Sequence, residues 1–95
     1  MYEEISVYNL KDKDNIIDLR SEQSYNNNHI KNAINIPFEK LIIDPSKYLN
    51  REIMYYLYCR CGYTSRNACK ILSNLGYKVT NIIGGYERWL LEYKE

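Results

Sequence analysis

The most informative segment of the sequence is Ile53-Met54-Tyr55-Tyr56-Leu57-Tyr58-Cys59-Arg60-Cys61-Gly62-Tyr63-Thr64-Ser65-Arg66. Its first six residues are apolar on both faces, which is typical of a central strand in a parallel sheet that helices cover on each side. Apolar residues then recur at helical spacing, which predicts a helix over about residues 64–75. The stripe of this helix consists of Ala68, Ile71, Leu72 and Leu75. A short loop that begins with Cys59 therefore joins a buried strand to a helix.

Patterns elsewhere predict alternating strands and helices. Strands are expected at residues 4–8, 15–19, 33–36 and 79–83, because each is a short apolar run, and turn residues or a proline end several of them. Helices are expected at residues 21–28, 37–43 and 86–93, and Ser21 is a suitable N-cap for the first. This alternation predicts an α/β fold with a mostly parallel sheet.

Length and composition exclude several classes of protein. The 95 residues predict one domain over residues 1–95, and 13 basic against 12 acidic residues exclude a polybasic nucleic-acid binder. No apolar run approaches the roughly 20 residues of a membrane span, and the acidic start is unlike a secretory signal. We therefore expect a cytoplasmic protein with no nucleic-acid or membrane partner. Three cysteines suggest free thiols, and the many Ile, Asn, Lys and Tyr residues hint at a bacterial source.

The loop after the central strand is the candidate site. In parallel α/β sheets, sites form beyond the carboxyl ends of the strands, and the N–H groups at a helix start favour an anion. Arg60 and Arg66 add positive potential, so the placement favours the thiolate of Cys59, which is the nucleophilic form. The alternative is that Cys59 is a small buried hydrophobic residue, as many free cysteines are.

Four blocks of the sequence, taken in order, resemble the rhodanese-like sulfurtransferase family. Residues 15–20 resemble a strand that ends in Asp-x-Arg, and residues 25–37 resemble the block Tyr-x-x-Gly-His-Ile-x-Gly-Ala-x-Asn-Ile-Pro. Residues 58–65 resemble the active-site loop, often Tyr-Cys-Arg-Ser-Gly-x-Arg-Ser, and residues 84–89 resemble the closing Gly-Gly-x-x-x-Trp. Most of the chain is thus similar to a single-domain rhodanese.

The chain departs from the family pattern at four positions. Asn28 and Asn32 replace two glycines around His29, and we expect the turn to survive because Asn tolerates positive φ. Cys61 stands where Ser is common. Thr64 stands where Arg is common, which removes one donor toward an anionic substrate and leaves the preferred substrate open.

The resemblance implies a five-stranded sheet in the order 1-5-4-2-3, with helices on both faces. It also implies that Cys59 takes sulfur from thiosulfate or a persulfide, carries it as a persulfide, and passes it to a thiol, cyanide or a protein acceptor. No metal or organic cofactor is implied, and we expect a monomer or a weak dimer. Residues expected to bind the substrate or persulfide are Arg60, Cys61, Gly62, Tyr63, Thr64 and Ser65, with Asp18, Arg20 and Arg66 in support.

The sequence also fits other functions. A phosphatase or arsenate reductase of the same fold would use Cys-x5-Arg, whereas Ser65 is the sixth residue after Cys59 and Arg66 is the seventh. A non-catalytic binding module of this fold usually lacks the cysteine, and a persulfide carrier that serves one partner lies between the two. Cys61 is either a resolving thiol or a small loop residue that points away.

Overall fold

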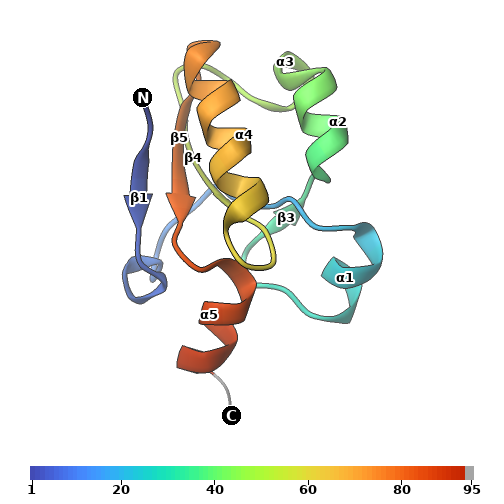
Figure 1. Ribbon diagram of the computed structural model, residues 1–95, viewed down its shortest axis with the longest axis vertical. Coiled ribbons are helices and arrows are strands. Elements are labelled where there is room, and N and C mark those ends of the chain that lie inside the picture. Colours follow the sequence, from blue (N-terminus) through green and yellow to red (C-terminus); the bar gives the residue numbers. More distant parts are fainter. Residues whose placement is uncertain (94–95) are drawn as a thin grey trace.

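A computed structural model describes residues 1–93, and these residues contain a five-stranded parallel sheet (Figure 1). The strand order is β1-β5-β4-β2-β3, which confirms the expected topology and the central place of β4. The sheet is entirely parallel. Its strands are β1 (Glu3–Ile5), β2 (Ile16–Asp18), β3 (Ile34–Asn35), β4 (Met54–Tyr58) and β5 (Lys78–Ile82).

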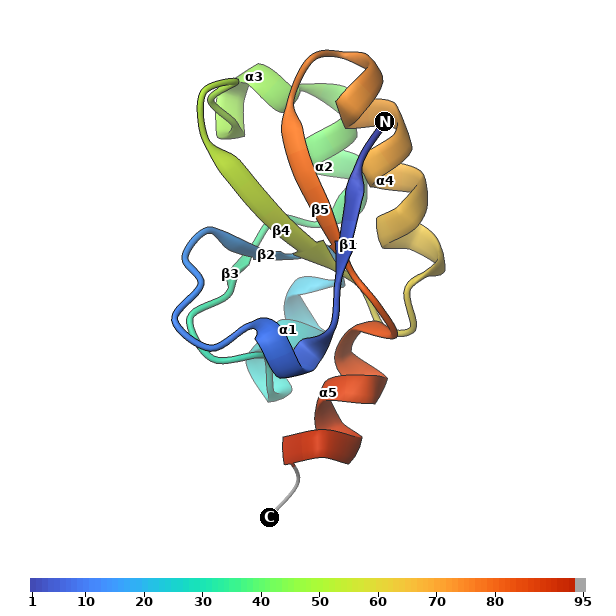
Figure 2. The ribbon, with the colours of Figure 1, turned by 90° about the vertical axis from the view of Figure 1, so that its left-hand side faces the viewer.

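Helices cover both faces of the sheet, as expected (Figure 2). On one face, α2 (Phe38–Ile43) and α4 (Tyr63–Asn74) enclose a core that includes Leu57. The second core, on the other face, includes Tyr58 and receives side chains from η1 (Val7–Asn9), α1 (Glu22–Asn27) and α5 (Gly85–Tyr93). Successive residues of β4 thus enter different cores, which explains why this strand is apolar on both sides.

Two local predictions were wrong, and one helix was not predicted. The expected strand at residues 4–8 ends at Ile5, because the Ser6 side chain accepts the Tyr8 N–H and starts the 3-10 helix η1. A further short helix, α3 (Pro45–Tyr48), follows α2. Leu75 lies just beyond α4 and is 47% exposed, whereas Cys69 is fully buried and completes the apolar face.

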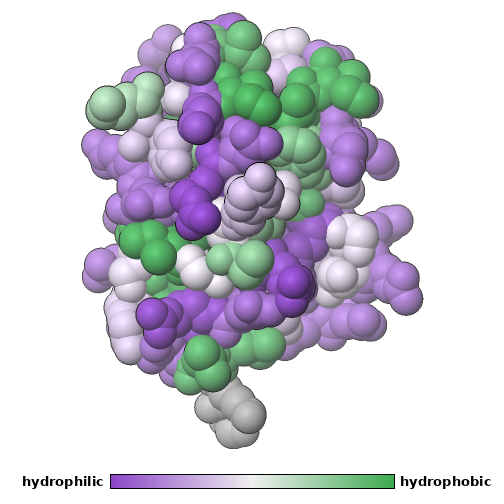
Figure 3. All heavy atoms as spheres, viewed as in Figure 1, coloured by the Kyte–Doolittle hydropathy of each residue, from purple (hydrophilic) through white to green (hydrophobic). Residues whose placement is uncertain are grey.

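The surface in Figure 3 is mainly polar. Its apolar side chains gather in separate groups, including one over α2 and one near the end of α5, instead of forming one continuous band. None of the helices within residues 1–93 has the length and apolar character needed to cross a membrane.

Candidate active site

Cys59 directly follows β4, at the carboxyl end of the central strand. Cys59 is almost completely buried. Its sulfur accepts two backbone hydrogen bonds, from the N–H of Gly62 at 3.1 Å and from the N–H of Ser65 at 3.2 Å. Ser65 lies in the first turn of α4, where N–H groups have no acceptor within the helix. The thiol sulfur takes the place of that missing acceptor, so the geometry suits a negatively charged sulfur.

Gly62 provides the turn that makes this arrangement possible. Its φ of +110° lies in a region that side chains rarely adopt, so glycine is the residue that lets the chain reverse between Cys59 and α4. The turn brings the Gly62 N–H and the helix start to the same side of the sulfur. The predicted glycine of the loop therefore has a defined conformational role.

Ser65 is fully buried behind the sulfur, and its Oγ lies 3.5 Å from the Cys59 Sγ. The hydroxyl donates to the Oδ1 of Asn81 at 2.5 Å, and the Gly62 carbonyl is a more distant acceptor at 3.2 Å. Asn81 was not among the predicted site residues. A fully buried amide inside the apolar strand β5 is the signal that could have identified it, because a buried polar group requires a partner.

The start of α5 holds the loop from the other side. The N–H groups of Tyr86 and Glu87 donate to the carbonyls of Cys59 and Arg60, each at 2.9 Å. Figures 1 and 2 show the loop after β4 beside the beginning of α5. The closing glycine-rich block of the sequence therefore orients the backbone of the cysteine loop.

The remaining loop residues are more exposed. Arg60 was expected to bind an anionic donor, but its Nη1 pairs with the Oε2 of Glu87 at 2.6 Å. Cys61 and Tyr63 are exposed, and Thr64 is half-buried. Arg66 is exposed on α4, where its guanidinium lies against Gly62. The loop thus exposes polar side chains around a nearly buried sulfur.

Asp18 and Arg20 brace the neighbouring strand instead of reaching the sulfur. The buried Asp18 carboxylate accepts from Arg20 and from the Tyr58 hydroxyl, and Arg20 also lies 4.0 Å from the ring centre of Tyr86. Burial, followed by the Asp18 hydrogen bond, raises the pKa of Tyr58 above its usual value. Together these contacts join the ends of β2 and β4 to α5.

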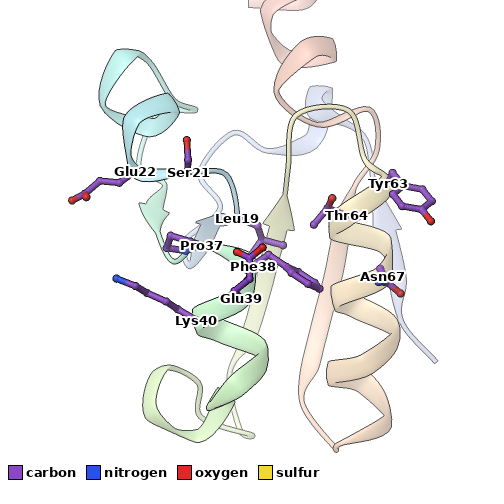
Figure 4. A pocket seen from close by; sticks show the side chains of 10 residues that line it. All are labelled: Leu19, Ser21, Glu22, Pro37, Phe38, Glu39, Lys40, Tyr63, Thr64 and Asn67. Carbon is purple, nitrogen blue, oxygen red and sulfur yellow. The ribbon is translucent and has the colours of Figure 1, made fainter.

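A hollow of about 700 Å³ lies beside the loop, between the start of α4 and the start of α2 (Figure 4). In Figure 4, Phe38 and Thr64 border the space from opposite sides, and the ring of Tyr63 extends away from it. Ser21, Glu22, Glu39 and Lys40 make its other side polar. The hollow therefore adjoins the loop at Tyr63 and Thr64, and its charged lining consists of Glu22, Glu39 and Lys40.

The other two cysteines have different surroundings. Cys69 lies in the core on α4, where burial, with smaller contributions from the charges of Glu4 and Cys59, raises the pKa of its thiol to about 12. Cys61 is exposed and free. Within residues 1–93, no cluster of three His, Cys, Asp or Glu side chains is placed to hold a metal ion.

Comparison with known proteins identifies the family. The family model of the rhodanese-like domain matches residues 5–92 of the sequence. The chain is 34% identical to the thiosulfate sulfurtransferase GlpE of Coxiella burnetii, over 94% of this chain and 88% of that protein. It is 35% identical to the adenylyltransferase and sulfurtransferase uba4 of Ogataea parapolymorpha, of which it spans only 19%.

Comparison with solved structures agrees with this family assignment. A rhodanese-related protein from Thermoplasma volcanium superimposes with a TM-score of 0.87 at 29% sequence identity, and the match covers 99% of this chain and 96% of that one. The cysteine loop, the strand order and the sequence matches agree, and we conclude that this chain belongs to the rhodanese-like domain family.

Proposed function

We propose that the protein is a sulfurtransferase that carries sulfur as a persulfide on Cys59. The observation that supports this most strongly is the pair of N–H groups, from Gly62 and Ser65, that point at the Cys59 sulfur at 3.1 and 3.2 Å. Fixed donors stabilise a thiolate without reorganisation, and the thiolate is the form that attacks sulfur. The names of the sulfurtransferase relatives support the same assignment.

The reaction has two balanced steps. The Cys59 thiolate attacks the outer sulfur of thiosulfate, the S–S bond of thiosulfate breaks, and sulfite leaves with the bonding electron pair. A thiolate acceptor or cyanide then attacks the outer sulfur of the persulfide. The Cys59 thiolate leaves, and the product is a new persulfide or thiocyanate. A low-molecular-weight persulfide can replace thiosulfate, in which case a thiolate leaves instead of sulfite.

The surroundings of Cys59 suit these steps. The N–H groups of Tyr63 and Thr64 also belong to the first turn of α4, so they are available to the charged outer sulfur. In this proposal the donor and the acceptor reach Cys59 from the side of Thr64, which borders the hollow. In this proposal the loop is supported by Asp18, Arg20 and Arg66. The protein acts as a single domain in the cytoplasm, as a monomer or weak dimer, and needs no cofactor.

The test is formation of thiocyanate from thiosulfate and cyanide by the wild type, Cys59→Ser and Cys61→Ser. We expect turnover by the wild type and by Cys61→Ser, and none by Cys59→Ser. Turnover that survives in Cys59→Ser would overturn the assignment of the nucleophile. If the wild type and Cys61→Ser are both inactive, with thiosulfate and with glutathione persulfide as the donor, transfer of sulfur to cyanide is excluded.

A further inference from the structure

A chain of hydrogen bonds leads from Cys59 through the buried interior to the edge of the sheet. Cys59 contacts Ser65, and the Ser65 hydroxyl donates to the Oδ1 of Asn81. The Nδ2 of Asn81 then donates to the Oε2 of Glu4 at 2.9 Å. The chain crosses from the cysteine loop to α4, then to β5, and ends on β1. The parallel register of β1 and β5 places Glu4 directly opposite Asn81.

The direction of these hydrogen bonds follows from the chemistry of Glu4. A carboxylate only accepts, so the amide of Asn81 turns its NH2 group toward Glu4 and its Oδ1 toward Ser65. The single hydroxyl proton of Ser65 then lies on the short contact to Asn81, since the Gly62 carbonyl is farther away. Ser65 therefore offers a lone pair, and no proton, to the Cys59 sulfur.

We propose that Glu4 and Asn81 are positioning residues that hold the Ser65 hydroxyl proton away from the Cys59 sulfur. The sulfur anion then has two backbone donors and lacks a third donor from the hydroxyl. A thiolate with fewer donors is more basic, and once it is deprotonated it attacks a sulfur donor faster, because its nucleophilicity is higher. This inference rests on the proposed function only where it names Cys59 as the nucleophile.

Other charged or titratable groups surround the same sulfur and must be separated from this effect. Glu4 is exposed, so its charge acts through solvent as well as through Asn81. Several groups near the loop could change the charge around Cys59. They are Arg60 and Cys61 in the loop, Arg66 and Cys69 on α4, Glu87 on α5 and Glu4 on β1. A test by mutation therefore needs a matched charge control.

The experiment measures alkylation of Cys59 by iodoacetamide against pH, with peptide masses distinguishing Cys59 from the exposed Cys61. In Glu4→Gln the new side-chain amide can donate as well as accept, so the Asn81 amide is no longer held in one orientation. When the Asn81 amide reverses, the Ser65 hydroxyl becomes free to donate to the sulfur. We expect the midpoint of the profile to move to lower pH, and alkylation below the midpoint to be about two- to fourfold faster, because the larger thiolate fraction outweighs the lower nucleophilicity of each thiolate. Glu3→Gln, which removes a neighbouring exposed charge, is the control and should stay within about twofold of the wild type.

The decisive comparison repeats Glu4→Gln in a Ser65→Ala background. If the hydrogen-bond chain carries the effect, Glu4→Gln changes nothing there. An equal effect in both backgrounds, or an equal effect of Glu3→Gln, would show that charge acts through space and would overturn the proposal. No change in Glu4→Gln would overturn it as well.

A second background keeps the test available if Ser65→Ala does not fold. Asn81→Leu removes the acceptor of the Ser65 hydroxyl, so this single variant should accelerate alkylation of Cys59. Adding Glu4→Gln to it should then have no further effect. Alkylation needs no sulfur donor, whereas thiocyanate formation does. The positioning proposal and the proposed sulfur transfer can therefore fail independently.

Discussion

The backbone of Gly85 lies directly against the carbonyl oxygen of Cys59, so closely that a Cβ at this position would overlap that oxygen. The same Cβ would also be only 3.0 Å from the carbonyl oxygen of Arg60. Because Gly85 has no side chain, α5 can begin here and donate its first N–H groups to the loop. Gly85 thus helps to set the backbone position of Cys59, although the two residues are far apart in sequence.

Gly85→Ala should therefore destabilise the fold by about 2 kcal/mol or more, since it adds a backbone overlap to the strain of positive φ. Gly76→Ala is the matched control, because Gly76 also has positive φ but would meet only the side chain of Arg51. Urea denaturation measures both. Equal losses of stability would contradict the role assigned to the contact between Gly85 and Cys59.

Tyr58→Phe should cost about 1–3 kcal/mol of unfolding free energy. Its hydroxyl donates to the buried Asp18 carboxylate at 2.5 Å and accepts the Ile30 N–H at 3.1 Å, and both partners would lose a hydrogen bond. Tyr56→Phe is the control, since its hydroxyl has no hydrogen bond to another described residue, and it should change stability by less than about 0.5 kcal/mol. Similar values for the two variants in thermal unfolding would contradict the bracing role of Tyr58.

Stability should fall in alkaline solution partly because of Cys69. Its pKa is raised from 9.0 to about 12 in the folded protein, so the unfolded chain releases the proton first. The stabilising contribution is complete below pH 9 and is lost as the pH rises from 9 toward 12, with a slope of up to about 1.4 kcal/mol per pH unit. Urea midpoints between about pH 8 and 11 should therefore decline less steeply in Cys69→Ala. Parallel slopes would exclude this contribution.

Glu87 should weaken the binding of an anionic donor, because it neutralises Arg60 beside the loop. In Glu87→Gln the KM for thiosulfate should fall by about two- to fivefold at low ionic strength, and the change should shrink in high salt. Glu52→Gln removes an exposed charge just before β4, at the opposite end of that strand from Cys59, and should have no such effect. An unchanged KM in both variants would contradict the electrostatic role.

Local patterns were sufficient to predict the main elements and the cysteine loop. The doubly apolar strand β4, the glycine of the loop and the apolar stripe of α4 are neighbours in sequence, so their relation is visible without a structure. The positive φ expected for the asparagines near His29 is found at Asn32, whereas Asn28 is extended, with φ of −174°. A pattern can predict that a turn is allowed, but the contacts around it decide which residue adopts positive φ.

Long-range contacts could not be predicted in the same way. Glu4 and Asn81 are 77 residues apart and meet only because β1 pairs with β5 in one particular register. Arg60 and Glu87 are 27 residues apart, and their pairing depends on where α5 begins. In both cases the sequence shows a polar residue without showing its partner, so neither the ion pair of Arg60 nor the place of Asn81 behind the loop could be predicted.

Sulfur loading on Cys59 can be measured by intact-mass spectrometry after incubation with thiosulfate. We expect the wild type and Cys61→Ser each to gain one sulfur atom that a reductant removes, and Cys59→Ser to gain none. Absence of the adduct from the wild type, with thiosulfate and again with glutathione persulfide, would show that Cys59 does not carry sulfur.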